Sequence, residues 1–281
     1  MNRFFYGWYM KCQSPVQTLA VIPAVHQVNH QRSCSIQIIT DGDSWNVEFP
    51  GDAYGRSGKN IFIGKNRFGE RGIHLDICTP DITAEGTLSF RCLSPLKYDI
   101  MGPFALIPFL ECRHRVRSMQ HAVFGTICIN GENYTFQNDC GYWEGDSGRS
   151  FPKEYVWTQC FFPDGSLMLA AADIPLAGIH FTGITGAVLW KGKEYRIATY
   201  LGARADQIRN GRLQIVQGNL ELETILLERS GHALKAPKQG DMVRTIHEST
   251  ACRAFYRFRK AGHTLFEIET QTASFEYEYP E

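Results

Sequence analysis

The chain has 281 residues, and its 29 Lys plus Arg residues balance 29 Asp plus Glu residues, so the formal net charge is zero. A nucleic-acid-binding protein ordinarily carries a basic excess, so this balance argues against that class of partner. Hydrophobic residues make up 43% and aromatic residues 12% of the sequence, which suits one large or two medium packed domains.

The sequence carries no evident export or membrane-spanning segment. Its first residues lack an apolar run of signal-peptide length, and the longest apolar run, residues 100–110, is short and holds two prolines. Nine cysteines, none in a CxxC pair, favour reduced, mostly buried thiols over a zinc ribbon. We therefore expect a cytoplasmic protein with no bound metal or cofactor.

Short alternating runs separated by turn residues fill the chain from its start. His26 and His30, four residues apart around Val28-Asn29, lie in a predicted hairpin tip, which we favour over a metal-binding pair. The clearest hairpins, in chain order, are 35–39 with 45–49 around Asp41-Gly42, 126–129 with 134–136 around Asn130-Gly131, and 187–190 with 194–198 around Lys191-Gly192. No window of a dozen residues keeps a helical period, so the predicted class is all-β.

The same features occur twice in order. Residues 5–12 resemble residues 154–160, with Trp8 matching Trp157. The first turn begins 33 residues after Trp8 (41 − 8), and its counterpart begins 34 residues after Trp157 (191 − 157). We predict two tandem lipocalin-like antiparallel β-barrel or sandwich modules packed together, residues 1–138 and 139–281, each with its tryptophan closing one end.

The letters Gly145-Asp146-Ser147-Gly148 match the loop around a serine-protease nucleophile. A trypsin-like loop continues with another glycine that completes the oxyanion hole, whereas Arg149 follows here. No earlier histidine has the sequence context of that family's base. We therefore interpret Ser147 as an accidental match.

A wider set of motifs gives a more specific interpretation. In chain order they are residues 101–114, Ser118-Met-Gln-His121, Gly141-Tyr142-x-Glu144-x-Asp146-x-Gly148-x-Ser150-Phe-Pro152, Trp157-Thr-Gln-Cys160 and Lys235-Ala-Pro237. Together they resemble the tocopherol cyclase family, itself similar to carotenoid-hydratase and lipocalin-like proteins, from residues 7–11 to residues 269–270. The chain departs from that family at Gly145, often Lys, at Ser147, usually Trp, and at Phe161, usually Asn in plant members.

The resemblance implies closure of a chromanol ring on a prenylated hydroquinone. A proton adds to a trisubstituted alkene, and the phenol oxygen attacks the tertiary cation. This reaction requires no redox cofactor, but it requires an acid kept protonated in an apolar site, aromatic faces beside the cation and a deep pocket for the isoprenoid tail. Two alternatives stay open: a non-catalytic carrier of a hydrophobic small molecule, or hydration of an isoprenoid double bond.

Glu144 and Asp146 are the first catalytic candidates. They lie two residues apart, so in an extended segment they point the same way and could share a proton. The alternative is a solvated acidic loop or an ion pair with Arg149 or Lys153.

His114 is the third catalytic candidate, as an orienting group or proton relay. His121 lies seven residues further on, which places the two on opposite faces of a continuous strand. Arg113, Arg115 and Arg117 share the face opposite His114; if that face is outside, His114 points inward. A buried structural histidine is the alternative interpretation.

The remaining candidates would bind the substrate, a hydrophobic prenylated small molecule. They are Tyr142, Trp143, Trp157, Gln159, His121 and Trp8, with ordinary packing as the alternative for each. Alternating Arg253, Arg257 and Arg259 could contact anionic lipid headgroups in a peripheral membrane contact, although a solvated sheet face is favoured by the zero net charge.

Overall fold

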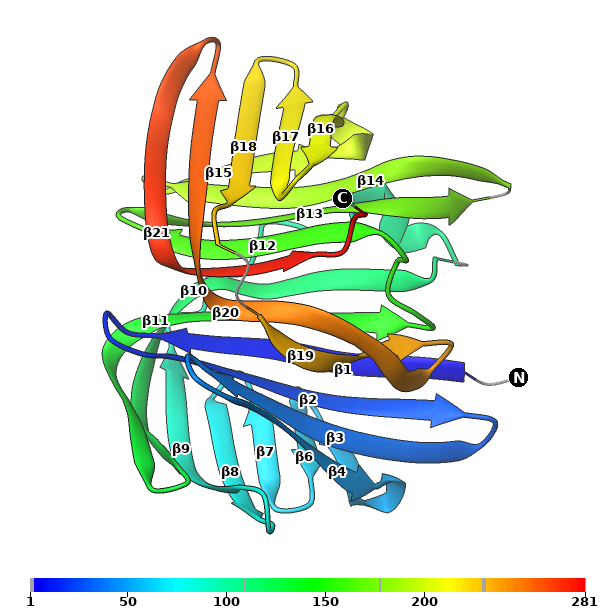
Figure 1. Ribbon diagram of the computed structural model, residues 1–281, viewed down its shortest axis with the longest axis vertical. Helices are drawn as coiled ribbons and strands as arrows, with labels where there is room; N and C mark the ends of the chain where they lie inside the picture. Colours follow the sequence, from blue (N-terminus) through cyan, green and yellow to red (C-terminus); the bar gives the residue numbers. More distant parts are fainter. Residues whose placement is uncertain (1–2, 109, 177, 229–230, 281) are drawn as a thin grey trace. The chain divides into compact units, whose positions relative to one another are not determined.

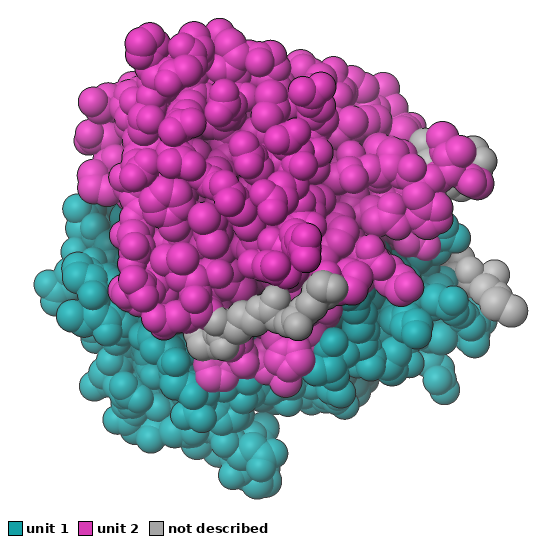
Figure 2. Space-filling view, turned by 45° about the horizontal axis from the view of Figure 1, so that its top comes forward, with its two compact units in different colours: residues 1–96, 114–151, 234–245 teal, residues 97–113, 152–233, 246–281 magenta. Residues whose placement is uncertain are grey.

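The computed structural model describes residues 3–108, 110–176, 178–228 and 231–280. The chain packs as two compact units, coloured in Figure 2. Unit 1 comprises residues 1–96, 114–151 and 234–245, and unit 2 comprises residues 97–113, 152–233 and 246–281. The expected modules 1–138 and 139–281 stay a prediction as domains, and their boundary falls within one long strand.

Unit 1 is built on one antiparallel sheet, which has eleven strands in the described part of the chain, in the order β4-β3-β2-β1-β11-β10-β9-β8-β7-β6-β5 (Figure 1). The strands are β1 Arg3–Gln13, β2 Thr18–Val28, β3 Gln31–Thr40, β4 Ser44–Pro50, β5 Tyr54–Ser57, β6 Asn60–Ile63, β7 Asn66–Gly69, β8 Gly72–Cys78, β9 Thr83–Arg91, β10 Cys112–Ile129 and β11 Glu132–Gly148. The short helix η1, Gly51–Ala53, links β4 to β5.

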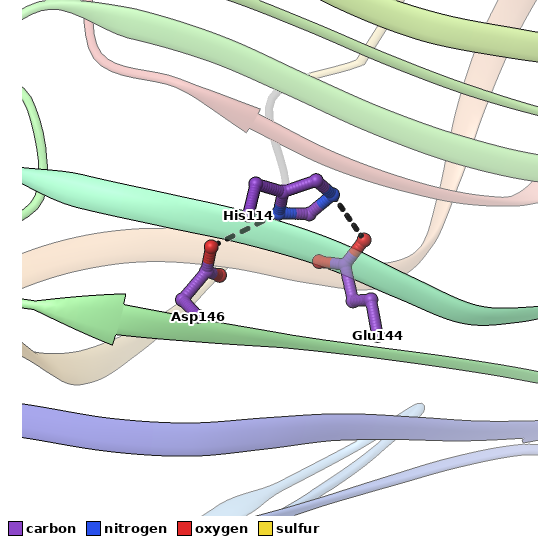
Figure 3. A group of neighbouring side chains, drawn as sticks. All are labelled: His114, Glu144 and Asp146. Atoms are coloured by element: carbon purple, nitrogen blue, oxygen red, sulfur yellow. Dashed lines mark hydrogen bonds and ion pairs between the residues drawn. The ribbon is translucent and has the colours of Figure 1, made fainter. Parts of the chain in front are cut away.

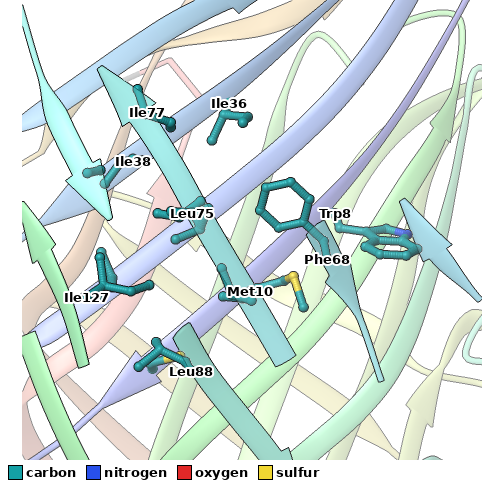
Figure 4. Packing of buried hydrophobic residues seen from close by; sticks show 14 of the residues in the cluster. Trp8, Met10, Ile36, Ile38, Phe68, Leu75, Ile77, Leu88 and Ile127 are labelled. Carbon is teal, nitrogen blue, oxygen red and sulfur yellow. The ribbon is translucent and has the colours of Figure 1, made fainter. Parts of the chain in front are cut away.

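The core of unit 1 lies on one face of this sheet. Alternate side chains on the central strands are apolar and point to the same side, such as Trp8, Met10 and Cys12 on β1, as period-two patterning requires. Figure 4 shows Met10, Ile38, Phe68 and Leu75, from strands distant in the sheet order, gathered in one cluster. The sheet therefore curls around its own hydrophobic side chains, which agrees with the predicted barrel or sandwich module.

Unit 2 repeats this plan with a second antiparallel sheet, in the order β15-β14-β13-β12-β21-β20-β18-β17-β16, and β19 also pairs with β20. The strands of this sheet are β12 Tyr155–Phe162, β13 Gly165–Leu176, β14 Ile179–Trp190, β15 Lys193–Ala198, β16 Arg204–Arg209, β17 Arg212–Gln217, β18 Leu220–Leu226, β19 His232–Lys238, β20 Asp241–Lys260 and β21 His263–Tyr277. Most of β19 and the start of β20, within residues 234–245, belong to unit 1. Two short helices, η2 Gly102–Leu106 and η3 Thr199–Leu201, complete the described elements.

The strand orders confirm the internal repeat and the all-β class. In both sheets three successive hairpins begin at the central strand, β1 or β12, and a long closing strand, β11 or β21, pairs back onto that strand. The predicted Asn130-Gly131 and Lys191-Gly192 turns have positive φ at both residues, as type I′ hairpins require, and His30 lies in the β2–β3 turn.

The match between Trp8 and Trp157 is wrong by one residue. Trp8 belongs to the core cluster of unit 1, whereas Val156 and Cys160 face the core of unit 2 and Trp157 points to the other face of β12. Aligning Cys12 with Cys160 pairs Tyr9, not Trp8, with Trp157. A slip of one residue reverses every side chain on a strand, so only Trp8 lies inside its module.

All nine cysteines are free thiols, but only Cys12, Cys34, Cys160 and Cys252 are buried, while Cys78 and Cys92 are exposed. Within the described ranges, no helix has the length and hydropathy needed to cross a membrane.

Candidate functional site

Three predicted catalytic side chains meet on β10 and β11, on the face of the unit 1 sheet opposite its core. Trp143 on β11 enters the core, so Glu144 and Asp146 do not share a face with it. Glu144 lies across from Tyr9 in the β1–β11 ladder, and Asp146 lies across from Gly7. His114 reaches the same face from β10. The alternation of a strand therefore places both carboxyl groups on one side, as the sequence predicted.

The imidazole of His114 lies between the two carboxyl groups (Figure 3). Its Nδ1 is 2.9 Å from Asp146 Oδ1, within hydrogen-bond distance, and its Nε2 is 3.1 Å from Glu144 Oε2. The second contact is an ion pair by distance, without the alignment of a hydrogen bond. The side chains of His114, Glu144 and Asp146 are 12%, 5% and 21% exposed, so a solvated acidic loop is ruled out.

This arrangement favours a positively charged imidazole. Burial alone would lower the pKa of His114 and is the largest single influence, but the charges of Glu144 and Asp146, together with the Asp146 hydrogen bond, outweigh it. The pKa of His114 consequently lies well above its usual 6.5. The raised pKa favours the imidazolium form of His114 at neutral pH, and a proton shared by the two carboxyl groups stays a prediction.

Tyr142 fixes the position of Glu144. Its phenol donates a short hydrogen bond to Glu144 Oε2, and both side chains are buried. Burial, followed by the charge of Glu144, raises the pKa of the Tyr142 phenol well above 10, so the phenol stays a neutral donor. The ring of Tyr142 also meets the ring of Tyr9 edge-on at 6.5 Å. Tyr142 thus contacts the predicted catalytic residue Glu144 directly. A substrate-binding role for Tyr142 stays a prediction.

The same three side chains offer one possible set of metal ligands, because their donor atoms all lie within 4.8 Å of one another. A metal ion would take one imidazole nitrogen and both carboxylates on one side of the ring. Here each nitrogen faces its own carboxylate, so the arrangement suits proton storage and transfer better than coordination.

Two predicted aromatic residues lie on the other side of the sheet. Trp8 and Trp143 meet edge-on in the unit 1 core, with ring centroids 4.9 Å apart. The guanidinium of Arg117 lies 5.9 Å from the Trp8 ring centroid and 5.8 Å from that of Trp143. Arg117 therefore faces the core and His114 faces away from it, so the condition for an inward-pointing His114, a basic face on the outside, is not met at Arg117. Stacking on indole rings compensates the arginine for its partial burial.

His121 is separate from the cluster. Its ring packs on the ring of Phe90 in the unit 1 core, with ring centroids 4.3 Å apart. Its Nδ1 lies 3.1 Å from Ser118 Oγ. Burial lowers the pKa of His121 to about 3, so it is a neutral core histidine. The prediction that His114 and His121 lie on opposite faces is confirmed, whereas a ligand-binding role for His121 stays a prediction.

The structure explains why Gly145 departs from the pattern of the resembled family. A Cβ at this position would lie 2.6 Å from Trp8 Cδ1 and 2.9 Å from the Gly7 carbonyl oxygen. Any side chain, lysine included, would displace the tryptophan. Ser147 lies in the β1–β11 ladder opposite Tyr6, so the protease-like letters belong to a regular strand rather than a nucleophile turn.

The other two substrate-binding candidates, Trp157 and Gln159, belong to unit 2. Both are buried on the face of β12 opposite the unit 2 core. Trp157 lies across from Glu276 on β21, as Tyr9 lies across from Glu144 in unit 1.

Sequence reasoning missed a second group of buried carboxyl side chains in unit 2. Glu276 accepts a short hydrogen bond from the Tyr155 hydroxyl, and Glu248 lies across from Glu276 on β20. Both glutamates are buried. Cys12 and Cys160 are 148 residues apart (160 − 12), whereas Glu144 and Glu276 are 132 apart (276 − 144), so no single alignment of the repeats matches both pairs. The correspondence of the two glutamates is visible only in the strand pairing.

Comparison with known proteins supports the resemblance in part. No family model matches the sequence. A maize (Zea mays) chloroplastic tocopherol cyclase is 26% identical over 147 residues, which cover 48% of this chain and 31% of that protein. The chain thus matches about a third of the length of this curated relative, and the match is shorter than the whole-chain resemblance that we predicted.

Solved structures share the fold at low sequence identity. Kievitone hydratase from Nectria haematococca has a TM-score of 0.61 and 8% identity, covering 97% of this chain and 88% of that chain. CghA bound to Sch210972 has a TM-score of 0.61 and 10% identity, covering 98% and 88%. A putative AttH from Nitrosomonas europaea has a TM-score of 0.57 and 10% identity, covering 100% and 93%. These likenesses establish the two-module all-β architecture.

Proposed function

We propose that the chain is an isoprenoid-modifying enzyme whose His114–Glu144–Asp146 cluster transfers protons, and that it closes a chromanol-type ring on a prenylated hydroquinone. The observation that carries this proposal is the buried imidazole clamped by two carboxyl groups. Groups with strongly shifted pKa values and specific charge partners concentrate at functional sites. The partial match to a tocopherol cyclase supports the same class of chemistry.

Ring closure conserves protons, which suits a cluster that can both give and take one. A proton from the cluster forms a new C–H bond at the alkene, and the phenol oxygen forms the C–O bond to the resulting tertiary cation. The phenolic O–H bond then breaks, and its proton returns to the cluster. Because the imidazole Nδ1 is within hydrogen-bond distance of Asp146, a proton held on the imidazole can pass to Asp146 and return from it.

The two carboxyl groups differ in accessibility, which assigns their roles in this proposal. Asp146 is 21% exposed and Glu144 is 5% exposed. The more accessible Asp146 passes the proton to the substrate. Glu144, held by Tyr142, keeps the imidazole in place and stabilises its charge. The high pKa of His114 makes the imidazolium a weak acid, so it stores the proton and a carboxyl group donates it.

The test is incubation of the purified protein with prenylated hydroquinones of several tail lengths in D₂O. Chromatography with mass detection should find a chromanol that carries one deuterium at the former alkene. Asp146→Asn and His114→Gln should each slow its formation at least about 100-fold, the usual contribution of general acid–base catalysis. A product heavier by one water identifies a hydratase instead.

The matched control is Glu132→Gln on the same strand. Glu132 and Tyr134 repeat the acid–tyrosine spacing of Glu144 and Tyr142, with a hydroxyl–carboxylate distance of 3.2 Å, but Glu132 is exposed. This variant should keep full turnover. Saturable binding without conversion, unaffected by Glu144→Gln and Asp146→Asn, would support a carrier and contradict the proposed enzyme.

A further inference from the structure

Gln159 on β12 of unit 2 is a fully buried amide that makes no hydrogen bond to the part of the chain the structure describes. Its exposed fraction is 0%, and both its Nε2 and its Oε1 are without a partner there. A primary amide offers two donors and an acceptor, and leaving them unsatisfied in the interior is costly. An amide kept in this state requires an explanation.

Two other glutamines of the chain show how this fold satisfies such a group. Gln37 in unit 1 donates to the carbonyl of Lys235 and accepts from its backbone N–H. Gln217 in unit 2 donates to the carbonyl of Arg196 and accepts from the N–H of Ala198. Each bridges two backbone groups, whereas Gln159 bridges none. The difference indicates that Gln159 serves a partner from outside the chain.

The neighbours of Gln159 define the chemistry of that partner. Trp157 and Phe161 lie two residues to either side on β12, so their aromatic side chains share its face. Ser166 lies across from Phe161 on β13, diagonally opposite Gln159 on that same face. Its Oγ is also fully buried and has no hydrogen-bond partner among the described residues.

We propose that this face of β12 and β13 binds the hydroxyl group of an aromatic ligand. A phenolic hydroxyl both donates and accepts, so it satisfies the Oε1 and Nε2 of Gln159 together, and Ser166 adds a second polar contact. The flanking Trp157 and Phe161 suit the ring that carries the hydroxyl. The inference deepens the proposed function where that phenol is the substrate's own, but binding at Gln159 requires no turnover.

The binding test compares a 4-alkylphenol with its methyl ether by titration calorimetry, using the full chain with Asp146→Asn so that no turnover occurs. The ether accepts but cannot donate, which leaves the Gln159 carbonyl oxygen unsatisfied. The phenol should bind at least about tenfold more tightly than the ether. In Gln159→Met this preference should disappear, and in Ser166→Ala it should shrink severalfold.

Stability separates ligand binding from a structural role. Gln159→Met has a similar volume and removes an unsatisfied amide, so its melting temperature without ligand should equal or exceed that of the parent. Gln217→Met removes two backbone hydrogen bonds and should melt lower. A parent that binds the ether as tightly as the phenol, or a Gln159→Met variant that keeps the preference or melts far lower, would overturn the proposal. Inactivity of the parent towards prenylated hydroquinones, with phenol binding retained, would reject only the proposed reaction.

Discussion

The two units share one strand order and differ in the residue that accompanies their matched carboxyl groups. Glu144 lies opposite Tyr9 and Glu276 lies opposite Trp157, and each glutamate accepts a tyrosine hydroxyl. In unit 1 the imidazole of His114 joins the pair, whereas in unit 2 Glu248 lies across from Glu276. The shared strand order places a glutamate at the same position in both units. The residue on the neighbouring strand, His114 in unit 1 and Glu248 in unit 2, determines whether a protonated imidazole lies beside that glutamate.

The pH dependence of stability should give the largest effect, because the folded unit 1 shifts the pKa values of His121 and His114 in opposite directions. Burial lowers the pKa of His121 to about 3, so its contribution is complete above pH 6.5 and is lost as the pH falls towards 3. This loss amounts to about 5 kcal/mol at most. Urea unfolding at several pH values should show that His121→Gln loses less unfolding free energy at acid pH than the parent. Part of the loss should remain, because burial also lowers the pKa of His26.

His114 has the opposite sign. Its folded pKa is raised, so its contribution is complete below pH 6.5 and is lost as the pH rises through the folded value. An unchanged acid limb in His121→Gln would contradict the assignment of a neutral core histidine.

Removal of one charge from the unit 1 cluster should be the next largest effect. Glu144→Gln leaves the cationic imidazole with one carboxylate, and breaking a buried ion pair in this way costs about 3 kcal/mol. The free energy of unfolding at pH 7 measures this cost. The exposed partner variant Glu132→Gln should change it by less than about 0.5 kcal/mol. Equal effects of the two variants would show that the cluster carries no special charge interaction.

Tyr142 in unit 1 and Tyr155 in unit 2 test whether both units contribute to the proposed reaction. Tyr142→Phe and Tyr155→Phe each remove a donor from a buried glutamate, and each should cost about 2 kcal/mol of unfolding free energy. Product formation should fall only in Tyr142→Phe, because the proposed proton transfer occurs in unit 1. A loss of turnover confined to Tyr155→Phe would move the reaction to unit 2.

The smallest effect is expected at the glycine that admits Trp8. Gly145→Ala must displace the indole and should cost about 1 to 2 kcal/mol, as overpacking of a core usually does. Gly42→Ala, where a Cβ would meet nothing within 4 Å, serves as the control and should be nearly neutral. Differential scanning calorimetry distinguishes them, and identical curves would show that Trp8 is not fixed by its strand neighbour.

Local sequence signals were sufficient for the fold. Glycine-containing turns mark the hairpins, and the collinear order of strands and turns reveals the duplication. The two-residue spacing of Glu144 and Asp146 correctly placed both on one face. These features depend on neighbouring residues alone, so one sequence contains them.

Which face is inside could not be predicted, because it depends on what packs against each strand. The face of β1 and β11 that carries Tyr142 and Glu144 is as buried as the face that carries Trp143. Apolar alternation therefore does not show which face is inside, and the side on which Arg117 lies stayed open in the sequence. The partnership of His114 with both carboxyl groups joins residues about thirty positions apart. Glu276 corresponds to Glu144 only through its place in the sheet, because the offset between the repeats changes along the chain.

The central claim is that His114 is a cation held between Glu144 and Asp146, and its nitrogens can be observed directly. A pH series of ¹⁵N-detected imidazole spectra should show the His114 ring protonated at both nitrogens well above pH 6.5, while the His121 ring stays neutral down to about pH 3. A His114 ring that is already neutral at pH 7 would contradict the account.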